Sequence, residues 1–247
     1  MKFSESFLRV ANGFLTVIVS IVFLTLGAYA VYALWDNNTV YSAARNVQEE
    51  MLKLKPEDGA SFEELLAINP DVCAWVSLDG TSIDYPILQG ETNLTYINTD
   101  VYGEFALAGS IFLDTRSNRD FSDPYSLVYG HDMVQGRMFG DLPFYKEEEF
   151  FRENRTGELI LPDRSHSLSI YAVILTNSTD EMIFNPDRYN GGLSELIRYA
   201  ENNALHLHEE MTEELRERAD GDLQILSLTT CSSEFTDART IVLAVME

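Results

Sequence analysis

Basic residues are scarce in this sequence, and their scarcity excludes one class of partner. The 247 residues include 17 lysines and arginines against 40 aspartates and glutamates, so the net charge is −23. Proteins that bind nucleic acids need a basic surface to neutralise phosphates, so no nucleic-acid partner is expected. The chain has neither internal repeats nor low-complexity tracts, and its length fits one sizeable domain with appendages.

Cysteine and histidine are also rare, which limits thiol and metal chemistry. The chain has two cysteines and four histidines, and none of them form a cluster with metal-ligand spacing. No metal and no other cofactor are therefore expected. Cys73 and Cys231 could form a disulfide in an oxidising compartment. We expect instead a free Cys231, with Cys73 as a small apolar residue beside Trp75.

One long hydrophobic run occurs, near the N-terminus, and no second one follows Arg239. Phe14 to Leu34 carries no charge, and about 20 apolar residues are enough to span a bilayer as a helix. Lys2 and Arg9 precede the run and Asp36 follows it, so the N-terminus is expected in the cytoplasm.

A cleaved signal peptide is the alternative for this run, because Gly27–Ala30 contains a small-x-small site. The apolar stretch continues past that site, which favours an uncleaved anchor. We therefore divide the N-terminal part into a cytoplasmic segment, residues 1–13, and a transmembrane anchor, residues 14–35. The remaining domain is expected outside the membrane.

Helical spacing follows the anchor. Apolar residues recur at helical intervals from Val40 to Leu54, residues 55–59 break the pattern, and Ser61–Glu64 is typical of a capped helix start. These features predict an N-terminal helical extension over residues 36–67 that packs on the domain following it.

The rest of the chain, residues 68–247, is predicted to be mostly β. Alternating apolar runs give eight candidate strands, a number that fits a closed or nearly closed barrel: Ala74–Leu78, Ser82–Leu88, Ser110–Asp114, Ser126–Gly130, Gly157–Pro162, Leu168–Thr176, Leu223–Thr230 and Arg239–Met246. Apolar residues from Leu193 to Met211 recur at three- and four-residue steps. They predict one helix in the connection between the sixth and seventh strands.

Cys231 directly follows the seventh predicted strand, and Arg239 begins the eighth. A thiol closing one strand and a guanidinium opening the next indicate a shared site at one edge of the barrel. The alternative is a buried, inert cysteine, which is common for this residue type.

His131 follows the fourth predicted strand directly, after Gly130. His166, His206 and His208 lie in polar surroundings, and the last two are expected on a solvated helix surface. The reactive form of cysteine is the thiolate, which a nearby base or cation stabilises. His131, Cys231 and Arg239 supply these functions if the fold brings them together.

Five segments extend this pattern and resemble class B sortases: Trp75–Gln89, Gly109–Asp114, Tyr129–Met133, Met138–Leu142 and Leu228–Cys231 with Arg239 behind it. The resemblance runs in family order from about Ile68 to the C-terminus. Ser227 stands where the family usually has threonine, and Asp132 stands where asparagine is common. Neither departure affects the three reactive side chains.

The resemblance implies a mostly β protein with an eight-stranded sortase-type barrel and the activity of a cysteine transpeptidase, a peptidase-like hydrolase class. Cys231 would be the nucleophile, His131 the general acid and base, and Arg239 the group that holds the substrate and stabilises the oxyanion. Thr229, Thr230 and Tyr129 are assigned to substrate binding, with packing beneath the site as the alternative. An acidic loop that binds Ca²⁺, as in class A sortases, is an alternative to the absence of a metal.

The resemblance also implies the partners. Secreted proteins with a C-terminal sorting signal, of the Asn-Pro-x-Thr type, would be cleaved and transferred to an amine of the cell-wall precursor in a Gram-positive bacterium. A lysine of a pilin is the alternative nucleophile, and the single membrane segment favours wall anchoring.

Two other classes remain. A papain-like protease is disfavoured because its cysteine precedes its histidine, whereas here His131 comes first. A catalytically silent, membrane-tethered β-domain that only binds ligands would keep the fold but have an unreactive Cys231.

Overall fold

The computed structural model describes residues 2–56 and 62–247, with the side chains of residues 2–6 left out. The predicted helix break at 57–59 and the predicted cap at Ser61 lie outside this part. The chain divides into two compact units, Met1–Ala43 and Ala44–Glu247.

The first unit is helical. Helix α1 (Lys2–Leu52) continues without interruption through the predicted anchor and the first part of the predicted extension. Phe7–Leu52 is the one helix in the described residues that is long and apolar enough to cross a membrane. Its last turns, from Ala44 onward, belong to the second unit. The boundaries at residues 35 and 67 remain predictions.

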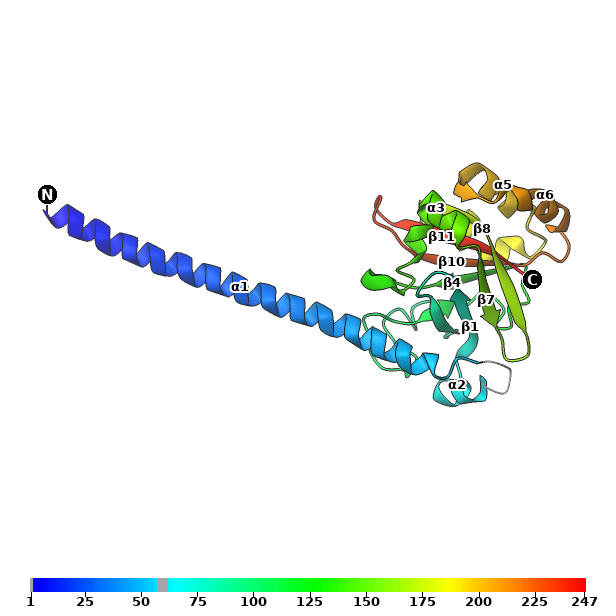
Figure 1. Ribbon diagram of the computed structural model, residues 1–247, viewed down its shortest axis with the longest axis horizontal. Helices are drawn as coiled ribbons and strands as arrows, with labels where there is room; N and C mark the ends of the chain where they lie inside the picture. The colour runs from blue at the N-terminus through cyan, green and yellow to red at the C-terminus, as the bar shows by residue number, and fades with distance from the viewer. Residues whose placement is uncertain (1, 57–61) are drawn as a thin grey trace. The chain divides into compact units, whose positions relative to one another are not determined.

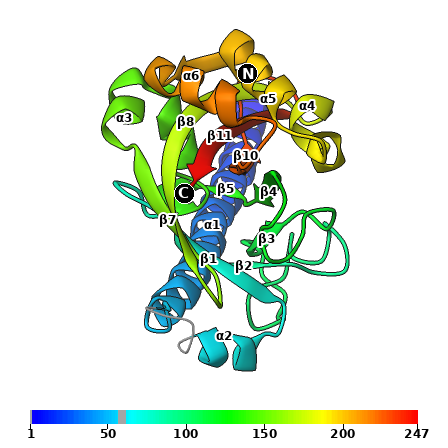
Figure 2. The ribbon, with the colours of Figure 1, turned by 90° about the vertical axis from the view of Figure 1, so that its right-hand side faces the viewer.

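The second unit is built on a mixed β-barrel (Figures 1 and 2). Its strands occur in the order β11-β10-β4-β3-β2-β1-β7-β8, and pairing of β11 with β8 closes the ring. The eight barrel strands confirm the eight predicted ones: β1 (Val72–Leu78), β2 (Asp84–Leu88), β3 (Ile111–Leu113), β4 (Tyr125–Tyr129), β7 (Thr156–Ile160), β8 (Ser165–Asn177), β10 (Ile225–Cys231) and β11 (Ala238–Met246).

Short helices and a small hairpin complete this unit. In both views α2 lies at one end of the barrel, and α5 and α6 lie at the other. The elements are α2 (Phe62–Ile68), β5 (Asp132–Met133), η2 (Val134–Gly136), β6 (Arg137–Met138), η3 (Leu142–Lys146), α3 (Glu148–Glu153), α4 (Glu181–Phe184), η4 (Pro186–Tyr189), α5 (Ser194–Asn203), β9 (Ala204–Leu207) and α6 (Glu209–Arg218).

The single helix predicted over Leu193–Met211 is wrong. The structure has two helices there, α5 and α6, with strand β9 between them. Strand β9 adds to the edge of β8 through the pairs Ala172↔Leu207 and Val173↔His206. The helical spacing of the apolar residues describes only which side chains are buried. It does not exclude a strand, and here residues 204–207 gain backbone hydrogen bonds by pairing with β8.

The predicted positions of His206 and His208 on a solvated helix are wrong for the same reason. His206 lies on β9, and its Nε2 donates to the Lys146 carbonyl at 2.7 Å. His208 is 5 % exposed and stacks on Phe151 with ring centroids 4.3 Å apart. Burial lowers the pKa of His208.

Strands β10 and β11 separate two hydrophobic cores, because successive side chains point to opposite faces. Leu228 and Val242 belong to the core that includes β1, β2 and β7. Ile225 and Ile241 belong to the second core, which contains buried residues of α4, α5 and α6. A third core joins the end of α1 and α2 to β1 and β2, with Met51 among its residues. Burial on both faces makes β10 and β11 a rigid base for the residues at their ends.

We expect Leu228→Ala to destabilise the protein strongly. Leu228 is fully buried (0 % exposed), and such a truncation costs about 2–5 kcal/mol because it leaves a cavity. A loss of roughly 3 kcal/mol would lower the Tm by about 6–12 °C in a unit of this size. Leu94→Ala is the matched control, since Leu94 is 75 % exposed. Equal melting temperatures for the two variants in calorimetry would contradict the prediction.

Candidate active site

His131 and Cys231 lie at the ends of two adjacent parallel strands, β4 and β10, that finish at the same edge of the barrel. Strand β4 pairs with β10 in parallel, and the last pair is Tyr129↔Thr229. The Gly130 amide donates to the Thr229 carbonyl at 3.1 Å and extends the ladder. His131 and Cys231 each stand two residues beyond that last pair, so the fold brings these two predicted residues to one edge.

Arg239 joins them from the neighbouring antiparallel strand. Cys231 and Arg239 are direct partners in the β10–β11 ladder, and directly opposed residues have their side chains on the same face. Cys231 is an exposed free thiol, and Arg239 is half-buried with its guanidinium donating to the Ala238 carbonyl at 2.9 Å. The residue that carries the thiol and the residue that carries the cation are therefore direct neighbours in the ladder, at the strand ends.

The strand alternation assigns a face to these groups. Ile241 and Tyr125 are buried on the side of α4, α5 and α6, and Arg239 and Cys231 share the parity of Ile241 along the ladder. The predicted reactive side chains thus lie on the same side of the sheet as α4, α5 and α6. They lie at the strand ends, past the part of the sheet on which these helices pack.

The histidine ring is oriented by a backbone carbonyl. His131 Nε2 lies 2.7 Å from the Ile97 carbonyl oxygen, and because a carbonyl only accepts, Nε2 carries a proton. Nδ1 is then the nitrogen that remains for proton transfer. Nothing in the sequence marks Ile97 for this role, because its backbone and not its side chain makes the contact.

Gly130 allows the histidine segment to pack closely on the barrel. A Cβ at this position would lie 2.4 Å from Ile111 Cδ1 and 2.7 Å from Phe139 Cδ2. Both neighbours are buried, so they have little room to move. Any side chain here would push His131 away from the strand edge.

Tyr129 is held by a buried carboxylate that was not identified from the sequence. Its hydroxyl donates to Asp114 Oδ2 at 2.8 Å, and Arg116 donates to the same carboxylate at 2.9 and 2.8 Å. Burial raises the pKa of Asp114, but the Arg116 hydrogen bonds outweigh it and the pKa lies below its usual value. Burial and the Asp114 charge raise the pKa of Tyr129, so its hydroxyl stays protonated. Asp114 ends a predicted strand, which is the only signal that could have pointed to it.

The two threonines assigned to substrate binding are almost completely buried. Thr229 and Thr230 are each 2 % exposed. Within the described part of the chain, neither hydroxyl has a hydrogen-bond partner. Both lie directly before Cys231, and this burial favours packing beneath the site over direct contact through their side chains.

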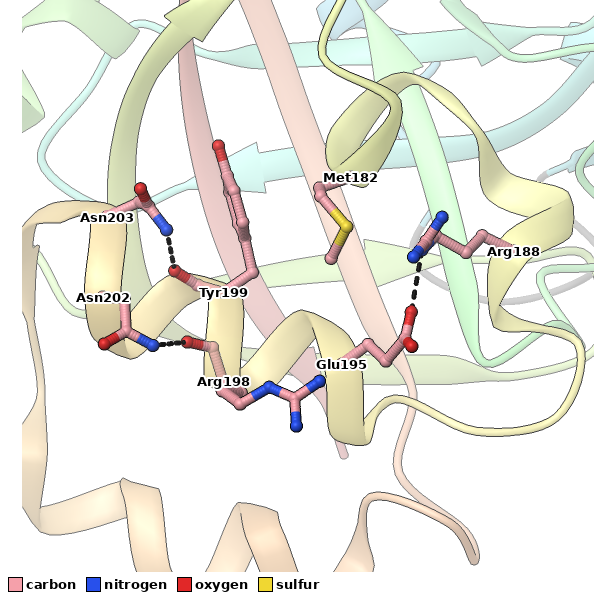
Figure 3. Close-up of a pocket in the computed structure, with 7 residues that line it drawn as sticks. All are labelled: Met182, Arg188, Glu195, Arg198, Tyr199, Asn202 and Asn203. Atoms are coloured by element: carbon pink, nitrogen blue, oxygen red, sulfur yellow. Dashed lines mark hydrogen bonds and ion pairs between the residues drawn. The ribbon is translucent and has the colours of Figure 1, made fainter.

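A small pocket of about 240 Å³ lies on the β8–β10 connection. Figure 3 shows Tyr199 beside Met182 there, with Arg188 and Glu195 paired at 2.8 Å. Apolar and charged side chains therefore occur together on this surface, between α4 and α5.

The second thiol has no such surroundings. Cys73 is buried on β1, and its Sγ lies 3.4 Å from the Ile87 carbonyl oxygen. Burial raises the pKa of the Cys73 thiol to about 12, which keeps it protonated at neutral pH. Cys73 is thus the buried apolar residue that the sequence predicts, and Cys231 is unpaired as expected.

Among residues 2–56 and 62–247, no group of three or more His, Cys, Asp or Glu side chains could hold a metal ion.

Comparison with known proteins identifies the family. No family model matches the chain. Sortase B of Staphylococcus aureus is 30 % identical over 189 residues, which cover 74 % of this chain and 73 % of that protein. A crystal structure of a Streptococcus pyogenes class B sortase involved in pilus biogenesis has a TM-score of 0.67 and 37 % identity, and covers 75 % of this chain and 97 % of that one.

A Staphylococcus aureus sortase B–substrate complex has a TM-score of 0.65 and 25 % identity, over 84 % of this chain and 94 % of that one. The barrel, the order of the matched segments and these similarities agree. The chain belongs to the class B sortases, which are cysteine transpeptidases.

Proposed function

We propose that Cys231, His131 and Arg239 catalyse transfer of a protein from its C-terminal sorting signal to an amine. The observation that carries this proposal is the strand pairing: β4 and β10 end at one edge, and Cys231 opposes Arg239 there. A thiol, a base and a cation are the three groups that acyl transfer by cysteine needs.

The reaction proceeds in two acyl transfers. The Cys231 thiolate attacks a backbone carbonyl of the sorting signal, the peptide C–N bond breaks, and a thioester forms. His131 protonates the leaving amine, using the ring nitrogen that Ile97 does not occupy. An incoming amine then attacks the thioester and gives its proton to His131. The thioester C–S bond breaks, Cys231 leaves as the thiolate, and His131 is protonated again for the next cycle.

Arg239 holds the substrate backbone and stabilises the oxyanion, together with a backbone N–H near Cys231. Its planar guanidinium can present two parallel donors to oxygen atoms, which a lysine cannot do. The position opposite Cys231 in the ladder supports this role, because it makes Arg239 the direct cross-strand neighbour of the proposed nucleophile.

The substrate is a secreted protein with a sorting signal of the Asn-Pro-x-Thr type. A related sortase B has been crystallised with a substrate, and this supports a bound signal peptide here as well. Tyr129 and the threonines before Cys231 would shape the floor of the site. The β8–β10 connection, with its pocket at Tyr199, would form one wall of the groove.

Helix α1 anchors the enzyme in the cell membrane, with residues 1–13 in the cytoplasm and residues 68–247 outside. The apolar side chains of α1 support this location, because they are exposed from Phe7 to Trp35. An enzyme placed there would meet its substrates after secretion, and the amine would come from the cell-wall precursor.

Assembly of a pilus is a second candidate, with a pilin lysine as the amine. One observation favours it: the related Streptococcus pyogenes enzyme, which is 37 % identical, is involved in pilus biogenesis. Both functions use the same acyl-enzyme, so only the amine distinguishes them.

We expect the full chain in detergent to join a sorting-signal peptide to an amine. A panel of signal peptides would be incubated with glycine peptides, a diamine or a lysine-containing pilin peptide, and products read by mass spectrometry. Cys231→Ala should abolish both product and acyl-enzyme. Cleavage without amine capture would indicate a hydrolase or the wrong nucleophile.

Arg239→Lys should lower kcat/KM about 10²-fold, since losing an oxyanion donor costs on the order of 3 kcal/mol. Arg216→Lys is the control, because Arg216 is exposed and pairs with Glu201 on the surface. Full activity of Arg239→Lys would be incompatible with the proposed role.

Thiol labelling separates an enzyme from a silent binding domain. At pH 8 iodoacetamide should modify Cys231 and leave Cys73 unlabelled, because the Cys73 pKa is about 12. With pH 8 about four units below that pKa, only about one Cys73 in 10⁴ is a thiolate. Cys73 should react after unfolding, or as the pH approaches 12. Rapid labelling of Cys73 alone in the folded protein would count against the enzyme.

A further inference from the structure

The residues that follow Cys231 and Arg239 meet on the opposite face of the sheet. Ser232 extends the ladder, with its amide donating to the Ala238 carbonyl at 2.9 Å. Alternation therefore directs the side chains of Ser232 and Thr240 away from the face that carries the thiol and the guanidinium. Thr240 is fully buried, so this face is closed by protein.

The Ser232 hydroxyl joins three other side chains there. It accepts from Thr240 Oγ1 at 3.1 Å and from Lys146 Nζ at 3.2 Å, and it donates to Glu234. A serine hydroxyl has one donor and two acceptor positions, so all of its hydrogen bonds are made. We call Lys146, Ser232, Glu234 and Thr240 the Lys146 cluster.

Lys146 links this cluster to the body of the barrel. It ends η3, where its carbonyl accepts from His206, and its ammonium donates to both Ser232 and Glu234. The Lys146 and Glu234 side chains are only 21 % and 35 % exposed. Hydrogen bonds from Lys146 and Ser232 lower the pKa of Glu234 to about 2, so this carboxylate is ionised at neutral pH.

The same charges act on the residue after His131. Loss of solvent raises the pKa of Asp132, Lys146 lowers it and Glu234 raises it. Asp132 therefore lies within the field of the Lys146 cluster, although no hydrogen bond joins them among the described residues. The residues after Cys231 and Arg239, Ser232 and Thr240, thus belong to the Lys146 cluster, and the residue after His131, Asp132, lies near its charges.

The loop after Cys231 depends on this contact. Residues 233–237 are all exposed. At the Arg239 end of the loop, the amide of Ser178, the residue directly after β8, donates to the Asp237 carbonyl at 2.9 Å. Thr240 and Lys146 supply the side-chain contacts at the Cys231 end. Without Lys146 this end keeps the ladder, the Thr240 hydroxyl and the Ser232–Glu234 hydrogen bond, but no contact to η3 through these side chains.

We propose that Lys146 is a positioning residue: its bonds to Ser232 and Glu234 fix the thiol of Cys231 relative to Arg239 from the far side of the sheet. The inference rests on the proposed function of these residues. A displacement of about 1 Å at a reacting group can lower a rate about 10²-fold. Lys146 contacts neither the thiol nor the guanidinium in the described hydrogen bonds, so it acts through its neighbours.

The test compares three variants of the full chain in detergent. Lys146→Met removes the charge and keeps much of the side-chain volume, and Lys146→Arg keeps a cationic donor. Lys55→Met is the matched control. Lys55, which follows α1, pairs with Asp84 at 2.9 Å with similar exposure, 31 % and 30 %. Asp84 begins β2, which β3 and β4 separate from β10.

We expect Lys146→Met to lower kcat about tenfold or more, with KM within about twofold of the parent enzyme and Tm within about 2 °C. Lys146→Arg should restore most of kcat, and Lys55→Met should leave it unchanged. A parental kcat in Lys146→Met would overturn the proposal. So would an equal loss in Lys55→Met, or a loss explained by a lower Tm.

A measurement without substrate separates this proposal from the proposed function. The rate of Cys231 alkylation by iodoacetamide should change at least about threefold in Lys146→Met and stay constant in Lys55→Met. Unchanged alkylation together with unchanged kcat refutes the positioning role. If the parent enzyme forms no acyl-enzyme with any peptide, the proposed function fails, and the alkylation rates alone decide the role of Lys146.

Discussion

The parallel pairing of β4 with β10 is the constraint on which the site depends. These two strands lie about a hundred positions apart in the chain, and no local interaction could bring their ends together. Their register, with Tyr129 opposite Thr229, makes the following residues neighbours at one edge. A shift of one residue would turn either the histidine or the thiol to the other face. The antiparallel partner β11 then adds a cation to the same face.

The register is stable because both faces of β10 and β11 are buried. One side packs inside the barrel around Leu228, and the other packs under the helices around Ile241. A slip would move polar side chains into both cores at once. The residues proposed to react need the opposite condition, exposure to a substrate. They lie at the strand ends, beyond the residues that pack in the two cores. Gly130 contributes by letting the chain pass close to Phe139.

The barrel strands are predictable from the sequence, and so is the meeting of His131, Cys231 and Arg239 at one strand edge, but the connections are not. Alternating apolar residues mark each strand because burial repeats every second position. The same reasoning fails at Leu193–Met211, where apolar spacing fits a helix although β9 interrupts it by pairing with β8. His206 and His208 were misplaced with it. Backbone and long-range contacts leave no local pattern, so the Ile97 carbonyl and the Asp114 carboxylate required the structure. Lys146 is a single lysine between turns, and only the fold brings it to Ser232.

The burial of Cys73 has a consequence for oxidation. When an oxidant converts an exposed thiolate to a sulfenic acid, a second thiol commonly reacts with that sulfenic acid. The disulfide that forms protects the first cysteine from further oxidation. This chain has no such resolving partner, because its only other thiol is enclosed in β1 and stays protonated. Oxidised Cys231 could be restored only by a thiol from another molecule. How long Cys231 stays in its reduced form would therefore depend on the reducing capacity of its surroundings.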